Sequence, residues 1–498
     1  MVINIILAIL VLSIIIIIHE FGHFIVAKAN GITVVEFSLG FGPKLIHFKK
    51  GETEYSLKLL PFGGACIMLG EDFLEADDDE QEDATEGNNT GKSGSELDND
   101  FCNGKTAEDN GFGNASRYSS DNTSAGSYMS EKKKQEALEA GYDMSKSFAN
   151  KSVWARIAVI AAGPIFNFIL AFVCSVVIIG SIGYDPCMVD VVYDNSPAVS
   201  AGLQEGDKII KVNNQKITFY RDYSFYRVYH ADDTMNITYE RDGQKYTTTL
   251  TPEYVKQQKY QMGVTLEQNG TIAGVSDGTP AQKAGIKKGD IITAVNGVAV
   301  DGSTKIIELV GQCNGESVDI TINRDGSTMQ LNVTPDSVEN EYYYTGFASY
   351  GARQKVSPIS VIGYAFKEVG YSVNTVVKSL GMMFTGQVGI NDLSGPVGTV
   401  SAMSNIVEES KADGTFYVIL NLLNLAGLIS ANLGVMNLLP IPALDGGRLV
   451  FLILEVLRGK PVKKEHEGMI HFVGMIFLFV LMIYVMFKDI SCLLYTSD

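Results

Sequence analysis

The sequence predicts a polytopic α-helical membrane protein with four transmembrane helices, two extracytoplasmic α+β domains and a small membrane-associated β-hairpin region. The chain of 498 residues is 46% hydrophobic and only 19% charged, which is typical of chains with membrane segments. Four apolar segments are each long enough to cross a bilayer, which takes about 18 or more residues. Between the second and the third lies a repeated motif, which predicts two similar domains.

The four predicted membrane helices lie within residues 1–72, 146–185, 414–448 and 469–490. A signal peptide is the alternative for the first, but no basic residue precedes its apolar run and no small-residue cleavage site follows it. Residues 356–386 are also apolar but carry three charged side chains. We therefore expect them to form an amphipathic helix on the outer membrane surface.

Lysine and arginine side chains indicate how these helices are oriented. They gather after the first helix, before the second, and in the loop 449–468 between the third and the fourth. Because cytoplasmic loops carry an excess of basic residues, we place these three regions in the cytoplasm. The long stretch between the second and third helices is then extracytoplasmic.

The formal net charge of −18 is unevenly distributed. Residues 71–130 contain 16 acidic and 3 basic side chains, so the rest of the chain is close to neutral. This composition predicts a disordered, acidic cytoplasmic insert over 73–145. No basic surface dominates, so a nucleic-acid partner is not expected. The six cysteines show no disulfide-framework spacing, which excludes a disulfide-stapled secreted domain.

The residues between the first helix and the insert predict a β-hairpin. Residues 54–60 have the alternation of a strand and run into Pro61-Phe62-Gly63-Gly64, which we interpret as a glycine turn. At the other end of the chain, residues 491–498 match no pattern and stay uninterpreted.

The repeated motif occurs around Pro197 and again around Pro280, 83 residues later. Each copy contains Ser/Thr-Pro-Ala, then Ala-Gly-hydrophobic, then Gly-Asp-x-Ile, and ends on a hydrophobic residue followed by Asn. The pattern resembles bacterial PDZ domains and predicts one domain over 186–256 and another over 257–338. PDZ domains can bind extended peptides at a sheet edge. Whether these two bind peptide ends or only act as spacers stays open.

The first membrane helix contains His19-Glu20-Phe21-Gly22-His23, an HExxH motif. Residues four apart share one face of a helix, so both imidazoles can bind one metal ion while Glu20 lies beside them. Ionisable groups within a membrane helix are costly and usually functional. The structural alternative is a polar pair that only bonds neighbouring helices.

Asp445 is our candidate for a third metal ligand. A catalytic zinc site takes three protein ligands, and a carboxylate is acceptable among them. Asp445 follows the third membrane helix, at the same membrane end as the two histidines. His471, which opens the last helix, is the rival ligand, and a helix cap is the structural alternative for Asp445. The residues around Asp445 that break the helix and let the backbone turn are Pro440, Pro442, Gly446 and Gly447.

Together these motifs resemble the site-2 protease family (peptidase M50), in particular the bacterial regulator-of-sigma-E protease type with two PDZ domains. The resemblance covers nearly the whole chain except 73–145. It rests on the HExxH motif, the PDZ-like repeats and Asn-Leu-Leu-Pro-Ile-Pro-x-Leu-Asp-Gly-Gly over 437–447. Further matching motifs are Gly40-Phe41-Gly42-Pro43, Pro61-Phe62-Gly63-Gly64, and Ala162-Gly163-Pro164 with Asn167.

The resemblance implies a role for each matching residue. His19, His23 and Asp445 would hold Zn²⁺. Glu20 would be the general base, which takes a proton from the attacking water and returns it to the leaving amine. Asn437 would hold substrate or stabilise charge, with an interhelical hydrogen bond as its structural alternative. The substrate-binding residues would be Gly63, Gly64, Asn437, Pro440 and Pro442.

We therefore expect a zinc-dependent intramembrane endopeptidase of the bacterial cytoplasmic membrane, with its site near the cytoplasmic side. The expected substrates are single-span membrane proteins already shortened outside, such as anti-sigma factors, and remnant signal peptides. The PDZ-like domains would act as a size filter or docking site. A membrane-anchored PDZ adaptor with a structural or lost metal site is the alternative. A metal-ion transporter would need inverted repeats or paired broken helices, which the sequence lacks.

Overall fold

The computed structural model describes residues 2–71, 138–139, 141–267, 269–386, 389, 395–411 and 414–496. The chain forms two compact units. We call Met1–Gly183 with Lys355–Asp498 the membrane unit, and Tyr184–Gln354 the repeat unit. Most of the acidic insert predicted over 73–145 lies outside the described residues, so its disorder stays a prediction.

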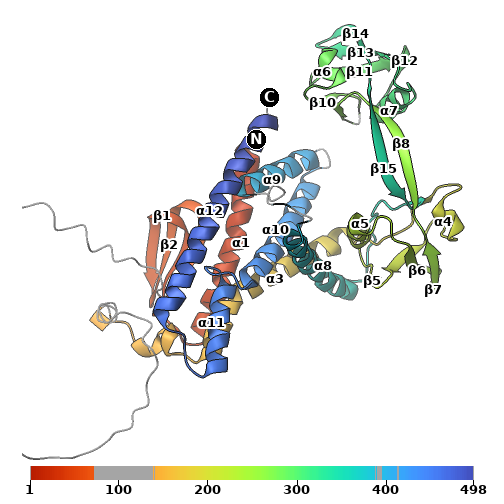
Figure 1. The fold of residues 1–498 in the computed structure, drawn as a ribbon. Coiled ribbons are helices and arrows are strands. Elements are labelled where there is room, and N and C mark those ends of the chain that lie inside the picture. The colour runs from red at the N-terminus through yellow and green to blue at the C-terminus, as the bar shows by residue number, and fades with distance from the viewer. Residues whose placement is uncertain are drawn as a thin grey trace, which may run out of the picture. The chain divides into compact units, whose positions relative to one another are not determined.

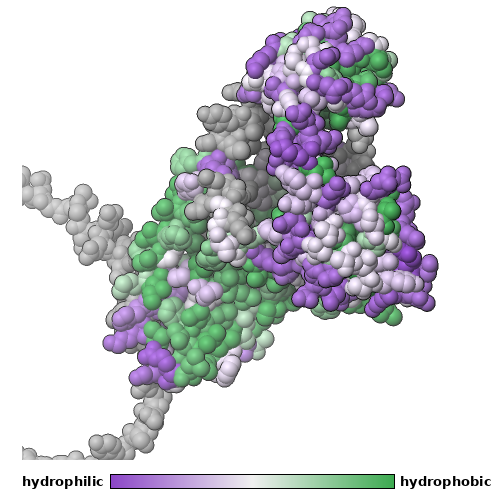
Figure 2. Space-filling model, turned by 45° about the vertical axis from the view of Figure 1, so that its right-hand side comes forward, coloured by the Kyte–Doolittle hydropathy of each residue, from purple (hydrophilic) through white to green (hydrophobic). Residues whose placement is uncertain are grey.

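Long apolar helices build the membrane unit (Figure 1). Four helices of its described part are long and apolar enough to cross a membrane, as predicted. They are α1 (Val2–Ala29), α3 (Val153–Ile182), α10 (Thr415–Leu438) and α12 (Lys464–Thr496). Hydrophobic side chains cover the visible face of this unit in Figure 2. Because α3 packs against both α1 and α10, side chains from three helices can meet beside it.

Three further helices of the described residues lie between α3 and α12 in the membrane unit. α8 (Pro358–Phe384) agrees with the helix predicted over 356–386 and packs on α3 and α10. α9 (Pro396–Ser410), which the sequence analysis misses, contacts α1, α10 and α12. The last span, α12, begins before the predicted residue 469 and continues to Thr496, into the tail that the sequence left uninterpreted.

α11 (Asp445–Arg458) corrects one prediction. Within 414–448, α10 ends at Leu438 and a proline-containing turn separates it from α11, in agreement with the helix break predicted at Pro440 and Pro442. The loop predicted over 449–468 is helical up to Arg458. The charged residues Arg448 and Glu455 lie about one turn before and after the buried Leu452, on the same face of α11, where they form ion pairs with other segments.

The predicted hairpin consists of β1 (Val34–Lys50) and β2 (Thr53–Met68) and lies alongside α1 (Figure 1). Its turn lies at Gly51, which has a φ of 66°. The tip of the hairpin is thus not at the predicted Pro61-Phe62-Gly63-Gly64, but the chain does reverse direction there, because residues 54–57 run parallel and residues 64–68 antiparallel to the same part of β1. Gly63 lies inside β2 with a φ of 86°, so it bends the strand and does not end it.

This bend lets one part of β1 pair with β2 twice. Residues 34–39 pair with 54–57 and also with 64–68. Residues 64–68 are therefore an outer edge of the sheet, which no other strand of the described residues covers. Beyond β2, the short helices η2 (Met144–Lys146) and η3 (Phe148–Asn150) lead into α3. The Phe148 N–H donates to the Leu69 carbonyl at 2.8 Å and ties this segment to the hairpin.

The repeat unit contains two four-stranded sheets with matching strand orders, β5-β4-β6-β7 and β12-β11-β13-β14. The first sheet comprises β4 (Lys208–Val212), β5 (Gln215–Lys216), β6 (Met235–Arg241) and β7 (Gln244–Leu250), with α4 (Pro197–Ser200) and α5 (Tyr220–Tyr229). The second comprises β11 (Ile291–Val295), β12 (Val298–Ala299), β13 (Val318–Arg324) and β14 (Ser327–Val333), with α6 (Pro280–Lys283) and α7 (Ser303–Gly311). Burial alternates along β6 and β13, so each sheet covers its own apolar core.

The two repeats are nested, which corrects the predicted boundaries 186–256 and 257–338. A ribbon of β8 (Glu253–Gln261) and β15 (Asp336–Tyr344) leads out of the first repeat and back to it. After this ribbon, β16 (Phe347–Ala348) pairs with β3 (Val191–Val192), and Phe347 is buried in the first core. The second repeat, which also contains β9 (Val264–Leu266) and β10 (Ile272–Val275), is thus inserted into the first. A sequence motif locates a repeat but does not reveal which distant segment completes its core.

Candidate functional site

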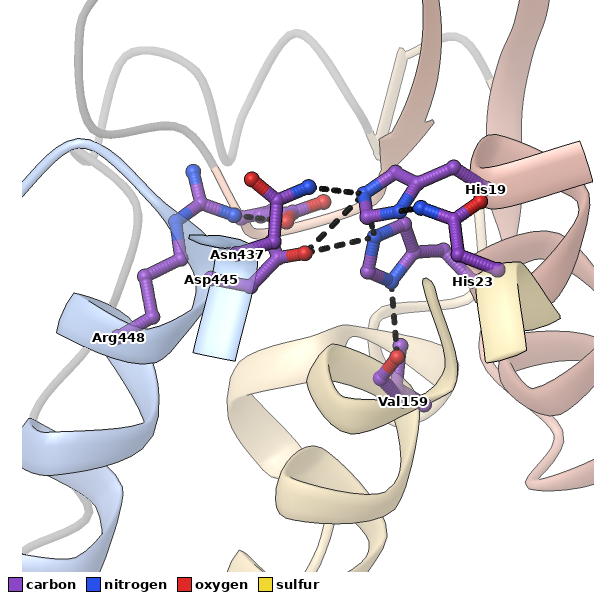
Figure 3. Close-up of polar contacts among 8 residues, drawn as sticks. His19, His23, Val159, Asn437, Asp445 and Arg448 are labelled. Carbon is purple, nitrogen blue, oxygen red and sulfur yellow. Dashed lines mark hydrogen bonds and ion pairs between the residues drawn. The ribbon is translucent and has the colours of Figure 1, made fainter. Parts of the chain in front are cut away.

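The structure brings three of the predicted site residues, His19, His23 and Asp445, together (Figure 3). The two histidines are buried and lie one turn apart on α1, and Asp445 is the first residue of α11. The two Nε2 atoms are 3.3 Å apart. Asp445 Oδ2 lies 3.1 Å from His19 Nε2 and 3.4 Å from His23 Nε2. All three atoms therefore face one point.

This triangle has the size that a tetrahedral zinc site requires. Zn–N and Zn–O bonds of about 2.0–2.2 Å place any two ligand atoms of a tetrahedron about 3.3–3.6 Å apart. Asp445 Oδ2 is buried and accepts no hydrogen bond from the described residues, although buried oxygens are normally paired. The helix-cap alternative fails here, because α11 has no side-chain cap. The three residues fit a zinc ion and would leave a fourth position open.

Both imidazole rings make a hydrogen bond at Nδ1, on the side of the ring away from the metal position. His23 Nδ1 lies 2.8 Å from the carbonyl oxygen of Val159 on α3, so it donates its proton there and leaves Nε2 free to bind a metal. His19 Nδ1 lies 3.1 Å from the Asn167 amide nitrogen, and Asn167 Oδ1 is buried without a partner in the described chain. With the Asn167 amide turned over, Oδ1 accepts the His19 Nδ1–H. Nε2 of His19 then also faces the metal position.

Two glycines let α1 and α3 approach closely enough for these contacts. A Cβ atom on Gly163 of α3 would lie 2.3 Å from His23 Nε2 and 2.7 Å from His19 Cε1. A Cβ atom on Gly22, inside the HExxH motif, would lie 2.5 Å from the carbonyl oxygen of Ala162. Real Cβ atoms do not make such short contacts, so both positions require glycine for reasons of space. The imidazoles fill the volume that a side chain at Gly163 would occupy.

A cleft of about 440 Å³ opens onto the three ligand atoms. Glu20 lines it beside the histidines, and the outer edge of β2, from Gly64 to Met68, forms another wall. A Cβ atom on Gly64 would lie only 3.1 Å from Glu20 Cγ. The edge of the sheet therefore passes directly beside the carboxylate of the HExxH motif, so an extended peptide paired with this edge would lie next to Glu20 and the metal position.

The model of peptidase family M50 matches residues 7–481. The chain belongs to peptidase family M50. It is 30% identical to the zinc metalloprotease RasP of Bacillus licheniformis, over 97% of both chains. It is also 30% identical to the regulator of sigma-W protease RasP of Bacillus subtilis, over 95% of this chain and 94% of the relative. The family resemblance inferred from the motifs is thus confirmed, and the chain is a zinc metalloendopeptidase of regulated intramembrane proteolysis.

Solved structures align with smaller parts of this M50 peptidase. The PDZ domain of HtrA3 aligns with 17% of this chain and 93% of its own, at 19% identity and a TM-score of 0.16. The HtrA-type protease AlgW aligns with 27% of this chain and 50% of its own, at 12% identity and a TM-score of 0.17.

The structure places the other predicted site residues of the M50 peptidase at different distances from the metal position. The Asn437 amide nitrogen lies 3.3 Å from His19 Nε2, at the end of α10. Gly64 lines the cleft, whereas Gly63, Pro440 and Pro442 are not among the described residues that line it. The rival ligand His471 is not part of the cluster, because its Nδ1 accepts the backbone N–H of Ala443 at 2.9 Å.

Ion pairs hold α11, which carries Asp445, against the rest of the M50 peptidase. Arg448, one turn after Asp445, pairs with Glu71 at the end of the hairpin, and both side chains line the cleft (Figure 3). Further along the helix, Glu455 pairs with the buried Arg156 of α3 at 2.5 Å. The sequence analysis misses these partners, as it misses the Val159 carbonyl, because no local pattern marks contacts between distant segments. Of the residues that support the site, only Asn167 was indicated by the sequence, as part of a motif that matches the family.

Proposed function

We propose that His19, His23 and Asp445 are the zinc ligands and that Glu20 is the general base of peptide-bond hydrolysis. The observation that carries this proposal is the triangle of three ligand atoms, 3.1–3.4 Å apart, with Glu20 on the wall of the same cleft. Bound zinc supplies Lewis-acid chemistry, which polarises the scissile carbonyl and makes water a stronger nucleophile. The hydrogen bonds to Val159 and Asn167 keep both imidazoles in the orientation and tautomer that such a site needs.

Glu20 would move the protons of the reaction. Its carboxylate takes a proton from the attacking water as the bond to the scissile carbonyl carbon forms. The same group then gives this proton to the leaving amine nitrogen as the peptide C–N bond breaks, so the carboxylate is regenerated. Asn437 donates its amide N–H towards the metal position, where it can hold the substrate carbonyl or stabilise the negative charge that develops on its oxygen.

The substrate would bind as a strand along residues 64–68 of β2. A helical peptide bond is internally hydrogen-bonded, so a transmembrane substrate has to unwind before water can attack. The uncovered edge of β2 offers the backbone groups that an unwound segment needs, at the level of Glu20. We propose single-span membrane proteins shortened outside the membrane as substrates, among them anti-sigma factors and remnant signal peptides. The name of the Bacillus subtilis relative, a regulator of sigma-W protease, supports this substrate class.

We further propose a location in the bacterial cytoplasmic membrane, with the repeat unit outside and the site near the cytoplasmic face. The basic residues after α1, before α3 and between α10 and α12 support this orientation. The PDZ-like repeats would then meet substrates from outside, as a size filter or as a docking site for peptide ends.

Replacing Glu20 by Gln tests the mechanism. Glutamine has nearly the same shape but cannot accept the proton, so we expect zinc to be retained while cleavage of a transmembrane model substrate in vesicles falls by about 10²–10⁴-fold. Asp445→Asn is the matched variant, in which we expect both zinc content and cleavage to fall. Full cleavage by Glu20→Gln, or unchanged zinc in Asp445→Asn, contradicts the assigned roles. A chain that binds zinc but cleaves nothing would point to the adaptor alternative.

A further inference from the structure

Asp445 depends on a turn whose backbone is strained. Two ligands lie on the regular helix α1, whereas Asp445 follows the short turn between α10 and α11. Within this turn Ala443 has a φ of 75°. Residues with a Cβ atom rarely adopt this left-handed conformation, because the Cβ approaches the carbonyl oxygen. Something outside the turn has to hold Ala443 there, two residues before the ligand.

His471 of α12 makes the contact that can hold it. Its Nδ1 accepts the Ala443 N–H at 2.9 Å, and its side chain is only 4% exposed. The ring of Phe451, on α11, lies beside it with centroids 5.5 Å apart. The acceptor is therefore fixed between two helices, so it constrains the direction of the Ala443 N–H and with it the backbone of the turn.

A second contact with α12 fixes the position of Pro442, the residue before Ala443 in the turn. Gly474 lies three residues after His471, and a Cβ atom there would lie 2.4 Å from Cβ of Pro442. The turn thus rests directly on the backbone of α12 at Gly474 and is hydrogen-bonded to it at His471. α12 contributes no ligand to the cluster of described residues, yet it determines where the chain enters α11.

We propose that His471 is a positioning residue for the zinc site: it holds Ala443 in the left-handed conformation and so places Asp445 opposite His19 and His23. This rests on the proposed role of Asp445 as a zinc ligand. Without the hydrogen bond, Ala443 relaxes towards negative φ, and the Asp445 carboxylate moves away from the two Nε2 atoms. The site then keeps two histidines and loses affinity for zinc.

The test compares zinc affinity in four variants of the full-length protein in detergent, measured by competition with a chelator. His471→Phe keeps a ring but removes the acceptor, and we expect zinc binding to weaken about 10–100-fold, as is usual when a group that orients a ligand is lost. His471→Asn places an amide oxygen near the position of Nδ1 and should retain most of the affinity. Ala443→Gly should bind zinc nearly as the parent does, because glycine adopts positive φ without strain.

The double variant His471→Phe/Ala443→Gly decides between positioning and general packing. If His471 acts by holding the strained backbone, glycine makes its hydrogen bond less necessary, and zinc affinity recovers at least tenfold over His471→Phe. No recovery, or an unchanged affinity in His471→Phe alone, overturns the proposal. Asp445→Asn is measured in parallel: if it binds zinc as the parent does, the assignment of Asp445 fails, irrespective of the His471 variants.

Discussion

Two buried carboxylates, one in each unit of this peptidase, differ in their hydrogen bonds. In the repeat unit, Asp207 is fully buried and its oxygens accept from Arg241 at 2.6 and 2.7 Å and from the Gln204 N–H at 2.9 Å. In the membrane unit, Asp445 Oδ2 is buried, faces two imidazole nitrogens and accepts no hydrogen bond from the described residues. The carboxylate whose oxygens accept hydrogen bonds stabilises the fold, whereas the carboxylate with a buried oxygen that accepts none marks a place for a ligand.

The second repeat makes this comparison sharper because it contains the same arrangement again. Asp290 accepts from Arg324 twice at 2.7 Å and from the Lys287 N–H at 2.8 Å. The Gly-Asp dipeptide that identifies each repeat in the sequence is thus a structural signature. A carboxylate in a motif indicates a ligand site only when one of its oxygens lacks a hydrogen-bond donor. The sequence does not show whether a donor is present. Four changes can break or sharpen the contrast between the two units.

The largest effect is expected from Gly163→Ala. The added Cβ would lie 2.3 Å from His23 Nε2, so both imidazoles have to move, and zinc affinity and cleavage should fall by about 100-fold or more. Gly180→Ala on the same helix is the control, because its Cβ would find the nearest atom 4.0 Å away. Zinc content and cleavage of a model substrate measure both variants. Normal zinc binding by Gly163→Ala would show that the imidazoles do not occupy the described positions.

Asp207→Asn should lower the stability of the repeat unit and leave the membrane unit unchanged. Removing the charge leaves Arg241 without its partner, and we expect the first repeat to lose about 2–3 kcal/mol of stability. Zinc content should not change, because the site shares no residue with the repeat unit. Amide hydrogen exchange in β4 and β6 of the full chain measures the loss, with the exposed Asp301→Asn as control. A concurrent loss of zinc would contradict the separation of the two units.

The second repeat should lose stability in acid. Hydrogen bonds from Arg324 lower the pKa of Asp290 below its usual value, more than burial raises it. A carboxyl whose pKa is lower in the folded state contributes its full stability above the unfolded pKa of about 3.9. That contribution is lost as the pH falls from there through the folded pKa. The protection factors of amide hydrogen exchange in β11 and β13 should therefore fall below about pH 4, and this pH dependence should be weaker in Asp290→Asn.

The smallest effect is expected from deleting residues 73–130. No proposed ligand or substrate-binding residue lies there, and long surface insertions change stability only slightly. Zinc content and basal cleavage should stay within about twofold of the parent. Loss of zinc from the deletion variant would show that the acidic stretch supports the site directly.

Local patterns predicted the parts of this structure that local physics determines. Apolar length predicted the four spans, and the i, i+4 spacing of His19 and His23 predicted their shared face. Contacts between distant segments were not predictable in the same way. The tip of the hairpin at Gly51 was not predicted, because a glycine can end a strand or bend it, and only the pairing partner decides. Likewise, nothing near Val159 or His471 in the sequence shows which backbone group each will meet.

The nesting of the two repeats also sets an order for synthesis. Phe347 completes the core of the first repeat and β16 pairs with its strand β3, but both follow the entire second repeat in the chain. A ribosome has therefore produced the whole second core, from Met262 to Val333, before the first can close. A chain that stops before residue 345 lacks this closing strand, although it contains every residue of both sequence motifs. The inserted second repeat is thus synthesised in full before the first repeat has all of its residues.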